Sequence, residues 1–194
     1  MKKQLGFILL ASLLAAPLTF ADVAGAPSGT YGVDKNHAYI TFSYLHHGFS
    51  NPHVGFDNFD ATLELDSENV ENSSLTVDID ANSINSRVEI FNEHLRGEDF
   101  FDTANHPGIT FVSTGMKSTG ENTYAVEGDL TIKGVTKAVT LDTTINRFGT
   151  VRGTQKLGVS AETKVMRSEW GLTNGLPNVS DEVTLLIEVE MPKI

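Results

Sequence analysis

The sequence predicts a mainly β, single-domain protein whose antiparallel strands close into a barrel, with one short helix inserted between strands. Apolar and polar residues alternate with period two in seven runs along the chain. Only the segment near residues 87–96 has a helical pattern instead. The runs are long and few helices are available to cover an open sheet, which favours a closed barrel of eight to nine strands. A two-sheet sandwich is the alternative.

The start of the chain has the features of a secretory signal peptide. Lys2 and Lys3 precede an apolar stretch at residues 7–16, and Thr19-Phe20-Ala21 fits a small-residue cleavage site. We expect cleavage after Ala21, a mobile leader of small residues at 22–29 and one domain at 30–194. The alternative is an uncleaved membrane anchor, for which the apolar stretch is short.

The composition limits the classes of partner and chemistry. The chain has 14 basic and 25 acidic residues, a formal net charge of −11, and no cysteine. An acidic surface argues against nucleic acid and anionic membranes as partners. Without cysteine there is no disulfide, thiol nucleophile or thiolate metal site.

The strands are predicted from the alternating runs taken in order. Each run has one apolar and one polar face, as half-buried antiparallel strands require. The runs lie at residues 39–44, 61–66, 75–80, 124–132, 139–145, 156–165 and 183–191. Turns are expected at Lys133-Gly134, at residues 119–122 and at Phe148-Gly149.

The helix is predicted over residues 87–96. Ser86 followed by Glu89 has the spacing of a capping box, and Gly97 is expected to end the helix in the left-handed conformation. Its apolar face consists of Val88, Phe91 and Leu95.

No established catalytic or metal-binding motif occurs in the chain. His46, His47 and His53 do not have a recognised ligand spacing, and adjacent strand residues point to opposite faces. We therefore expect these histidines to be polar groups at a barrel rim. Asp99 and Asp102 flank two phenylalanines, where they either do acid–base work or, as we prefer, cap a turn.

Two arginines have unusual neighbours. Arg96 and Arg167 each lie near aromatic and acidic residues, in HLRGEDFF and MRSEWGL. At a barrel rim such a cation binds the anionic or carbonyl head of a ligand. The alternative is an ordinary surface arginine paired with Glu98 or Glu169.

Four ordered segments resemble the YceI-like, or polyisoprenoid-binding, family. They are VDKNHAYITFSYLHHGFS, EHLRGEDFFDTANHPGITFVST, GDLTIKGVTKAVTLD and RSEWGL, and the resemblance runs from about Tyr31 to Met191. Many members have Arg-Asp where this chain has Phe91 and Asn92, so a head-group contact from that arginine is not expected here.

The resemblance implies an extended, lipocalin-like antiparallel β-barrel of about eight strands with a long apolar channel. It implies non-covalent binding of a long-chain isoprenoid or similar amphiphile in the periplasm, without catalysis, metal, cofactor or stable membrane insertion. The oligomeric state stays open, a homodimer included. The residues expected to line or close the channel are Phe42, Phe56, Phe59, Phe100, Phe111 and Trp170. Those expected at its mouth are His37, His94, Arg96 and Asp99.

Three other functions remain open on the sequence. An outer-membrane barrel would carry its apolar face outward, but the polar face here is rich in charged residues and the aromatic residues form no paired girdles. An enzyme acting on a channel-bound lipid would lose turnover, but not binding, on Asp99→Asn or His94→Ala. A protein-interaction sandwich would have a packed core without a ligand.

Overall fold

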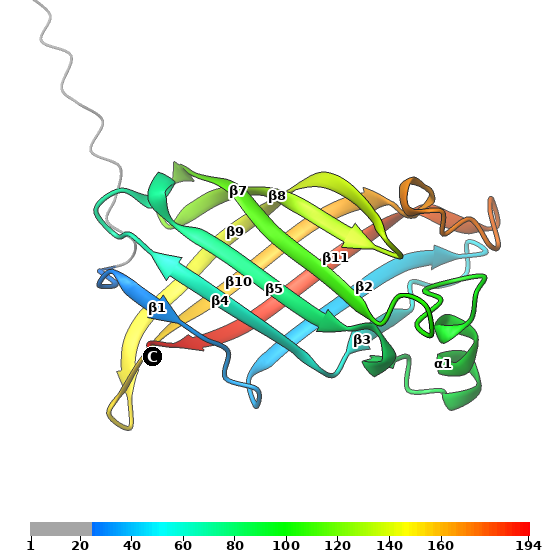
Figure 1. Ribbon diagram of the computed structural model, residues 1–194, viewed down its shortest axis with the longest axis horizontal. Coiled ribbons are helices and arrows are strands. Elements are labelled where there is room, and N and C mark those ends of the chain that lie inside the picture. The colour runs from blue at the N-terminus through cyan, green and yellow to red at the C-terminus, as the bar shows by residue number, and fades with distance from the viewer. Residues whose placement is uncertain (1–24) are drawn as a thin grey trace, which may run out of the picture.

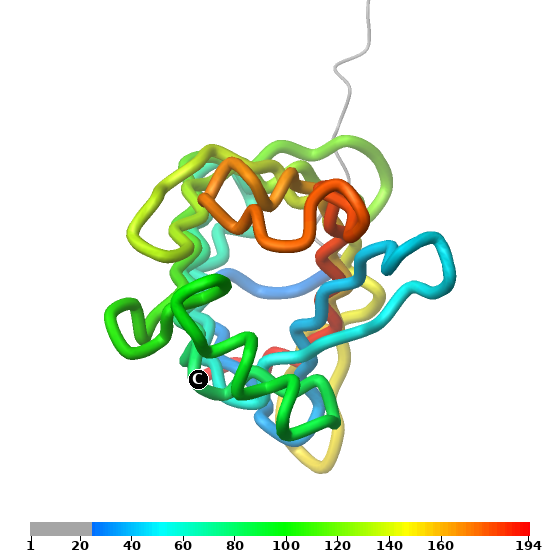
Figure 2. Tube along the Cα trace, turned by 90° about the vertical axis from the view of Figure 1, so that its right-hand side faces the viewer, coloured from blue at the N-terminus to red at the C-terminus, as the bar shows by residue number. Residues whose placement is uncertain are grey.

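The computed structural model describes residues 25–194 and confirms the predicted fold class. Eleven strands form one antiparallel sheet in the order β1-β4-β5-β7-β8-β9-β10-β11-β2-β3-β6, curled into a barrel (Figure 1). Seen end-on in Figure 2, the strands run around a common axis. The predicted signal peptide and cleavage site lie outside the described residues.

The elements follow one another with short connections. The strands are β1 Gly29–Tyr31, β2 Ala38–His46, β3 His53–Phe56, β4 Phe59–Leu65, β5 Ser74–Asp80, β6 Ile84–Asn85, β7 Gly108–Gly120, β8 Thr123–Ile132, β9 Val135–Val151, β10 Thr154–Met166 and β11 Val179–Pro192. The helix α1 spans Glu89–Arg96, and 3-10 turns occur at η1 Val70–Asn72, η2 Ala81–Ser83 and η3 Arg167–Trp170.

The two ends of the barrel are built differently. At one end β1 pairs with β4, and Tyr31 forms a bridge with Lys193 near the C-terminus, so the first and last strands meet. At the other end lie α1 and the loop that follows η3 (Figure 1). We call this the α1 end. The backbone amide of Asp57 donates to Ser83 O at 3.0 Å there, which joins the β3–β4 turn to the segment before β6.

The structure has more strands than the seven runs predict. Three of the additional strands, β1, β3 and β6, have two to four residues and are too short for a periodic signal. The fourth, β7, is long, but its pairing with β8 shifts register between Ser113 and Gly115. Ile109 and Phe111 face the core before this bulge and Met116 faces it afterwards. The bulge therefore breaks the alternation that would have identified β7.

The turns are confirmed in part. Lys133 and Gly134 both have positive φ and connect β8 to β9 as a two-residue hairpin. The expected turn at Phe148-Gly149 is wrong, because both residues lie within β9. The chain reverses at Arg152-Gly153, whose φ values of 52° and 86° suit a tight hairpin.

The helix begins two residues later than predicted. Val88 is its N-cap, without a side-chain capping bond, and Ser86 Oγ instead donates to Asn92 Oδ1 at 2.7 Å. Gly97 has an extended conformation, φ −69° and ψ 168°, rather than a left-handed one. Val88 is exposed, whereas Leu95 is buried. Across residues 25–194, no helix has both the length and the apolar character needed to cross a membrane.

Part of the segment predicted to be a mobile leader belongs to the fold. Ala26 is 2 % exposed, Tyr31 Oη donates to Pro27 O at 2.7 Å, and Gly29 begins β1. The folded domain therefore begins before residue 30.

A partly exposed ion cluster lies at the end of the barrel opposite α1. Lys156 Nζ lies 2.9 Å from Asp34 Oδ2 and 2.8 Å from Glu190 Oε2, and His37 Nδ1 lies 3.1 Å from Asp34 Oδ2. The hydrogen bonds from Lys156 and then His37 hold the pKa of the Asp34 carboxyl well below its usual range. Asp34, His37 and Glu190 have the spacing of metal ligands, but the Lys156 ammonium already contacts both carboxylates.

This cluster predicts a loss of stability in acid. Because the folded-state pKa of Asp34 is lowered, the unfolded chain binds more protons between the two pKa values. The stabilisation is therefore complete above the unfolded pKa, about 3.9, and is lost as the pH falls below it. We expect Asp34→Asn to flatten the slope of unfolding free energy against pH between pH 5 and about 2. Urea unfolding at several pH values measures that slope, and an unchanged slope would contradict the prediction.

Candidate functional site

The interior of the barrel holds two adjoining apolar cavities. The cavity at the α1 end, here the upper cavity, has a volume of about 260 Å³, and the lower cavity has about 150 Å³. Ile40, Ile79, Leu130 and Leu185 line both cavities and mark their junction. Strand side chains alternate between the lumen and the outside, so these residues face inward from four different strands. The two cavities lie end to end along the lumen.

All six predicted channel residues line these cavities. Four line the upper cavity (Phe42, Phe56, Phe100 and Trp170) and two line the lower one (Phe59 and Phe111). Phe42 and Phe56 have ring centroids 6.0 Å apart, and each also lies close to Phe101. Their position is therefore suitable for contact with an apolar chain, and their role in binding stays a prediction.

Trp170 closes one side of the upper cavity. It is 1 % exposed, and its Nε1 donates to Leu130 O at 3.2 Å. Gly171, next in the chain, has φ 76°, which ends η3 and allows the loop to turn back toward β11. The indole is thus held in a single position beside the junction of the two cavities.

None of the four predicted mouth residues lines either cavity in the described part of the chain. His94 and Asp99 are exposed on and after α1. Arg96 donates to Asn82 O at 3.1 Å and contacts Glu89 Oε1 at 3.0 Å, so it ties α1 to η2. His37 belongs to the ion cluster at the opposite end of the barrel. The structure therefore does not bring these four residues together.

Other polar side chains lie at the open end of the upper cavity. Tyr44, His46, Arg167 and Asn174 line it there. Tyr44 and His46 continue the alternation of Ile40 and Phe42 along β2. The predicted run ended at Tyr44 and therefore did not include His46. His46 is exposed at this rim, as the sequence predicts for the histidines.

The two neighbouring histidines do not point to opposite faces. The ring centroids of His46 and His47 are 4.5 Å apart in an edge-on arrangement. The expectation from strand alternation is wrong here because β2 ends at His46, and His47 has a φ of 50°. His53 is the first residue of β3 and pairs with Ser43 of β2. Ser43 lies three residues before His46 in the sequence.

Arg167 is the most buried charged group at the cavity wall. It is 8 % exposed, and three of its nitrogens donate to backbone carbonyls: Nε to Ser180, Nη1 to Leu172 and Nη2 to Val179, at 2.9, 2.5 and 3.2 Å. Burial lowers the pKa of its guanidinium from the usual value. The expected alternative, an exposed ion pair with Glu169, does not form, because Arg167 turns into the barrel.

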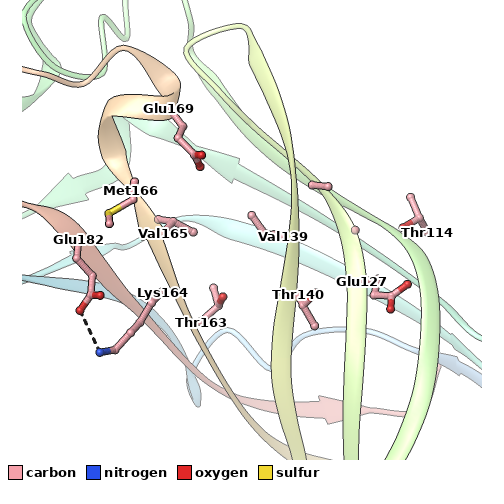
Figure 3. Close-up of a pocket in the computed structure, with 12 residues that line it drawn as sticks. Thr114, Glu127, Val139, Thr140, Thr163, Lys164, Val165, Met166, Glu169 and Glu182 are labelled. Carbon is pink, nitrogen blue, oxygen red and sulfur yellow. Dashed lines mark hydrogen bonds and ion pairs between the residues drawn. The ribbon is translucent and has the colours of Figure 1, made fainter.

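A third cavity lies on the barrel wall between β9 and β10. The two strands pair only as far as Asp142 and Glu162, and beyond this point they separate (Figure 3). The resulting surface cavity has a volume of about 600 Å³ and a charged rim that includes Lys164 and Glu182. Its open, charged rim makes it less suited to an apolar chain than the lumen.

The lumen can therefore hold a slender apolar group with a polar end. Apolar side chains line it along its length, and polar side chains gather at the α1 end. An apolar cavity with a few convergent polar groups is the usual form of a small-molecule site.

Comparisons with known proteins agree with this description. A model of the YceI-like domain matches residues 31–191. The protein YceI of Escherichia coli O17:K52:H18 is 34 % identical over 193 residues, which cover 98 % of this chain and 97 % of that protein. The crystal structure of Burkholderia cenocepacia BcnA superposes with a TM-score of 0.72 at 26 % identity, covering 81 % of this chain and 98 % of that one. A polyisoprenoid binding domain from Saccharophagus degradans superposes with a TM-score of 0.68 at 14 % identity, covering 86 % of this chain and 99 % of that one.

Proposed function

Since this chain belongs to the YceI-like domain family, we propose that it holds a long-chain polyisoprenoid or a related amphiphile non-covalently in its lumen. Isoprenoid quinones, polyprenyl phosphates and fatty amides belong to this class. The protein would carry, store or sense the lipid without transforming it.

The observation that carries this proposal is the pair of apolar cavities that meet at Leu130. A packed core would fill this space, whereas here several apolar side chains facing it, such as Leu185 and Val159, are only partly buried. Burial of each methylene group of a ligand would contribute about 0.8 kcal/mol, offset by the ordering of the chain. A long, thin, apolar ligand is the kind that gains most from such a lumen.

The family comparisons support the proposal at the level of the lipid class. The domain from Saccharophagus degradans is described as polyisoprenoid-binding, and at 14 % identity it is evidence of a shared fold. The site of action proposed for this chain is the periplasm. It rests on the signal-peptide features of residues 1–21 and not on the fold.

The test is native mass spectrometry of residues 22–194 purified without detergent, followed by organic extraction. We expect a discrete non-covalent adduct of several hundred daltons that extracts as a lipid, because an apolar lumen retains its ligand during purification. Incubation of the stripped protein with geranylgeraniol should restore an adduct.

A protein that purifies without an adduct and takes up neither geranylgeraniol nor a quinone would contradict the proposal. The alternative function, a protein-interaction domain with a ligand-free core, would then be the better supported one. If the extracted lipid changes chemically during incubation with the protein, the protein is instead an enzyme that acts on the bound lipid.

A further inference from the structure

The polar groups that line the upper cavity become more buried from its rim to its wall. His46 and Asn174 are exposed at the rim, Tyr44 is half-buried, and Arg167 is almost fully buried. The rest of this cavity is lined almost entirely by aliphatic and aromatic side chains. A bound amphiphile would thus meet a fixed positive charge at one end of its apolar path.

The guanidinium of Arg167 has unused hydrogen-bonding capacity. An arginine side chain carries five N–H bonds. Three of them are directed at the carbonyl oxygens of Ser180, Leu172 and Val179. The other two have no acceptor among residues 25–194. One N–H of Nη1 and one of Nη2 are therefore free to donate to an acceptor that enters the cavity.

Arg167 also has no carboxylate of residues 25–194 in direct contact. Among the described residues, no carboxylate oxygen lies within 4.0 Å of its nitrogens. The nearby acid is Asp181, whose oxygens accept from Ser168 N at 2.8 Å and Ser168 Oγ at 2.7 Å. Backbone carbonyls solvate a cation but carry no net charge, so the guanidinium has no counter-ion from the described part of the chain in direct contact. Asp181 attracts it only from a longer distance, and the pKa of that carboxyl is lowered first by the hydrogen bond from Ser168 and also by the charge of Arg167.

A purely structural role would explain only part of this arrangement. The three carbonyl contacts fasten the loop after η3 to the start of β11, and a neutral donor could do the same. The structural role does not require a full charge at the wall of an apolar cavity, where desolvation opposes it. A ligand anion would supply both a counter-ion in direct contact and the missing acceptors.

We propose that Arg167 forms the head-group subsite of the lumen and selects amphiphiles whose head is an anion, a carboxylate or a phosphate. This inference rests on the proposed lipid-binding function and adds the chemistry of the head group to it. Two guanidinium N–H groups donate to the anionic oxygens, while the apolar chain extends toward Leu130 and the lower cavity. The Tyr44 hydroxyl and His46 lie along the path of the head group to solvent.

The test compares ligands that differ only in the head group. Trp170 is the only tryptophan and lines the same cavity, so its fluorescence reports binding. The probes are geranylgeranyl phosphate against geranylgeraniol, and hexadecanoate against hexadecanol. We expect the anionic member to bind at least tenfold more tightly than the alcohol in one pair or both. The pair with the larger ratio of the two Kd values identifies phosphate or carboxylate as the preferred head group.

The matched variants are Arg167→Gln and Arg147→Gln. Arg147 is an exposed arginine of β9 away from the cavities, so its variant should keep the wild-type preference. Arg167→Gln should bind the anion and the alcohol within about twofold of each other, with binding of the alcohol retained. If this variant does not fold, the comparison of ligands in the wild-type protein decides alone.

Two outcomes would overturn the inference. If the wild-type protein binds both members of each pair tightly and equally, the head-group subsite is wrong while the proposed lipid-binding function stands. If it binds neither member of either pair, the head-group subsite is wrong, and the lipid-binding function is wrong as well if the protein also purifies without an adduct and takes up no quinone.

Discussion

Replacement of Leu185 by tryptophan is expected to weaken binding of long-chain isoprenoids by two to three orders of magnitude. Leu185 lines both cavities at their junction, and an indole there would separate them. A chain that can no longer extend into the lower cavity leaves about five methylene groups unburied, which costs about 4 kcal/mol. This corresponds to nearly a thousandfold in Kd. Native mass spectrometry during titration with geranylgeraniol measures the effect, because the variant carries a second tryptophan that would obscure the fluorescence of Trp170.

Chain length separates this effect from general damage. Geraniol, which is half as long, should keep nearly the same affinity for Leu185→Trp, because it fits within the upper cavity. The matched control is Leu186→Trp, next to Leu185 on β11 but on the opposite face and outside both cavities. If Leu185→Trp binds geranylgeraniol as the wild-type protein does, the chain does not pass through the junction.

Replacement of Gly128 by alanine is expected to be the most destabilising single-methyl addition in the barrel wall. The new Cβ would lie 2.6 Å from Phe111 Cε2 and 2.7 Å from the carbonyl oxygen of Val112. The ring of Phe111 thus lies directly against the backbone of β8 and leaves no room for a side chain. Overpacking of this kind costs about 1–3 kcal/mol. Urea unfolding followed by Trp170 fluorescence measures the loss.

The control for this variant comes from the same pair of strands. Gly115→Ala places its Cβ at an ordinary 3.5 Å from Glu127 Oε2, so we expect a change within about 0.5 kcal/mol. In the double variant Gly128→Ala/Phe111→Leu, a smaller side chain relieves the clash with the ring, so part of the stability should return. The contact with Val112 O remains, and full recovery is not expected. Equal stability of Gly128→Ala and Gly115→Ala would show that β8 shifts to make room.

The positions of the six channel residues could be predicted because the family motifs imply them, and strand parity agrees for those that lie in strands. Phe42 and Phe111 lie in strands, where alternate residues face the same side. The mouth residues could not be predicted in this way. His94 and Asp99 lie on a helix and in a loop, where the direction of a side chain depends on how that segment packs on the barrel. His37 lies immediately before β2, and only the path of this strand across the barrel shows that the start of β2 is at the far end from α1 (Figure 1).

The sequence by itself determined the class of fold, the single domain and most of the long strands. These features follow from local alternation, turn residues and composition, which act over a few neighbouring positions. The residues expected to face the lumen came from the family motifs. Only the tertiary structure decided the bulge in β7, the later start of α1 and the burial of Arg167. Each depends on contacts that strand alternation does not encode. A hydrogen bond joins Ser86 to Asn92 within the helix start, and Arg167 is buried because carbonyls five to thirteen residues away accept its hydrogen bonds beside an apolar cavity.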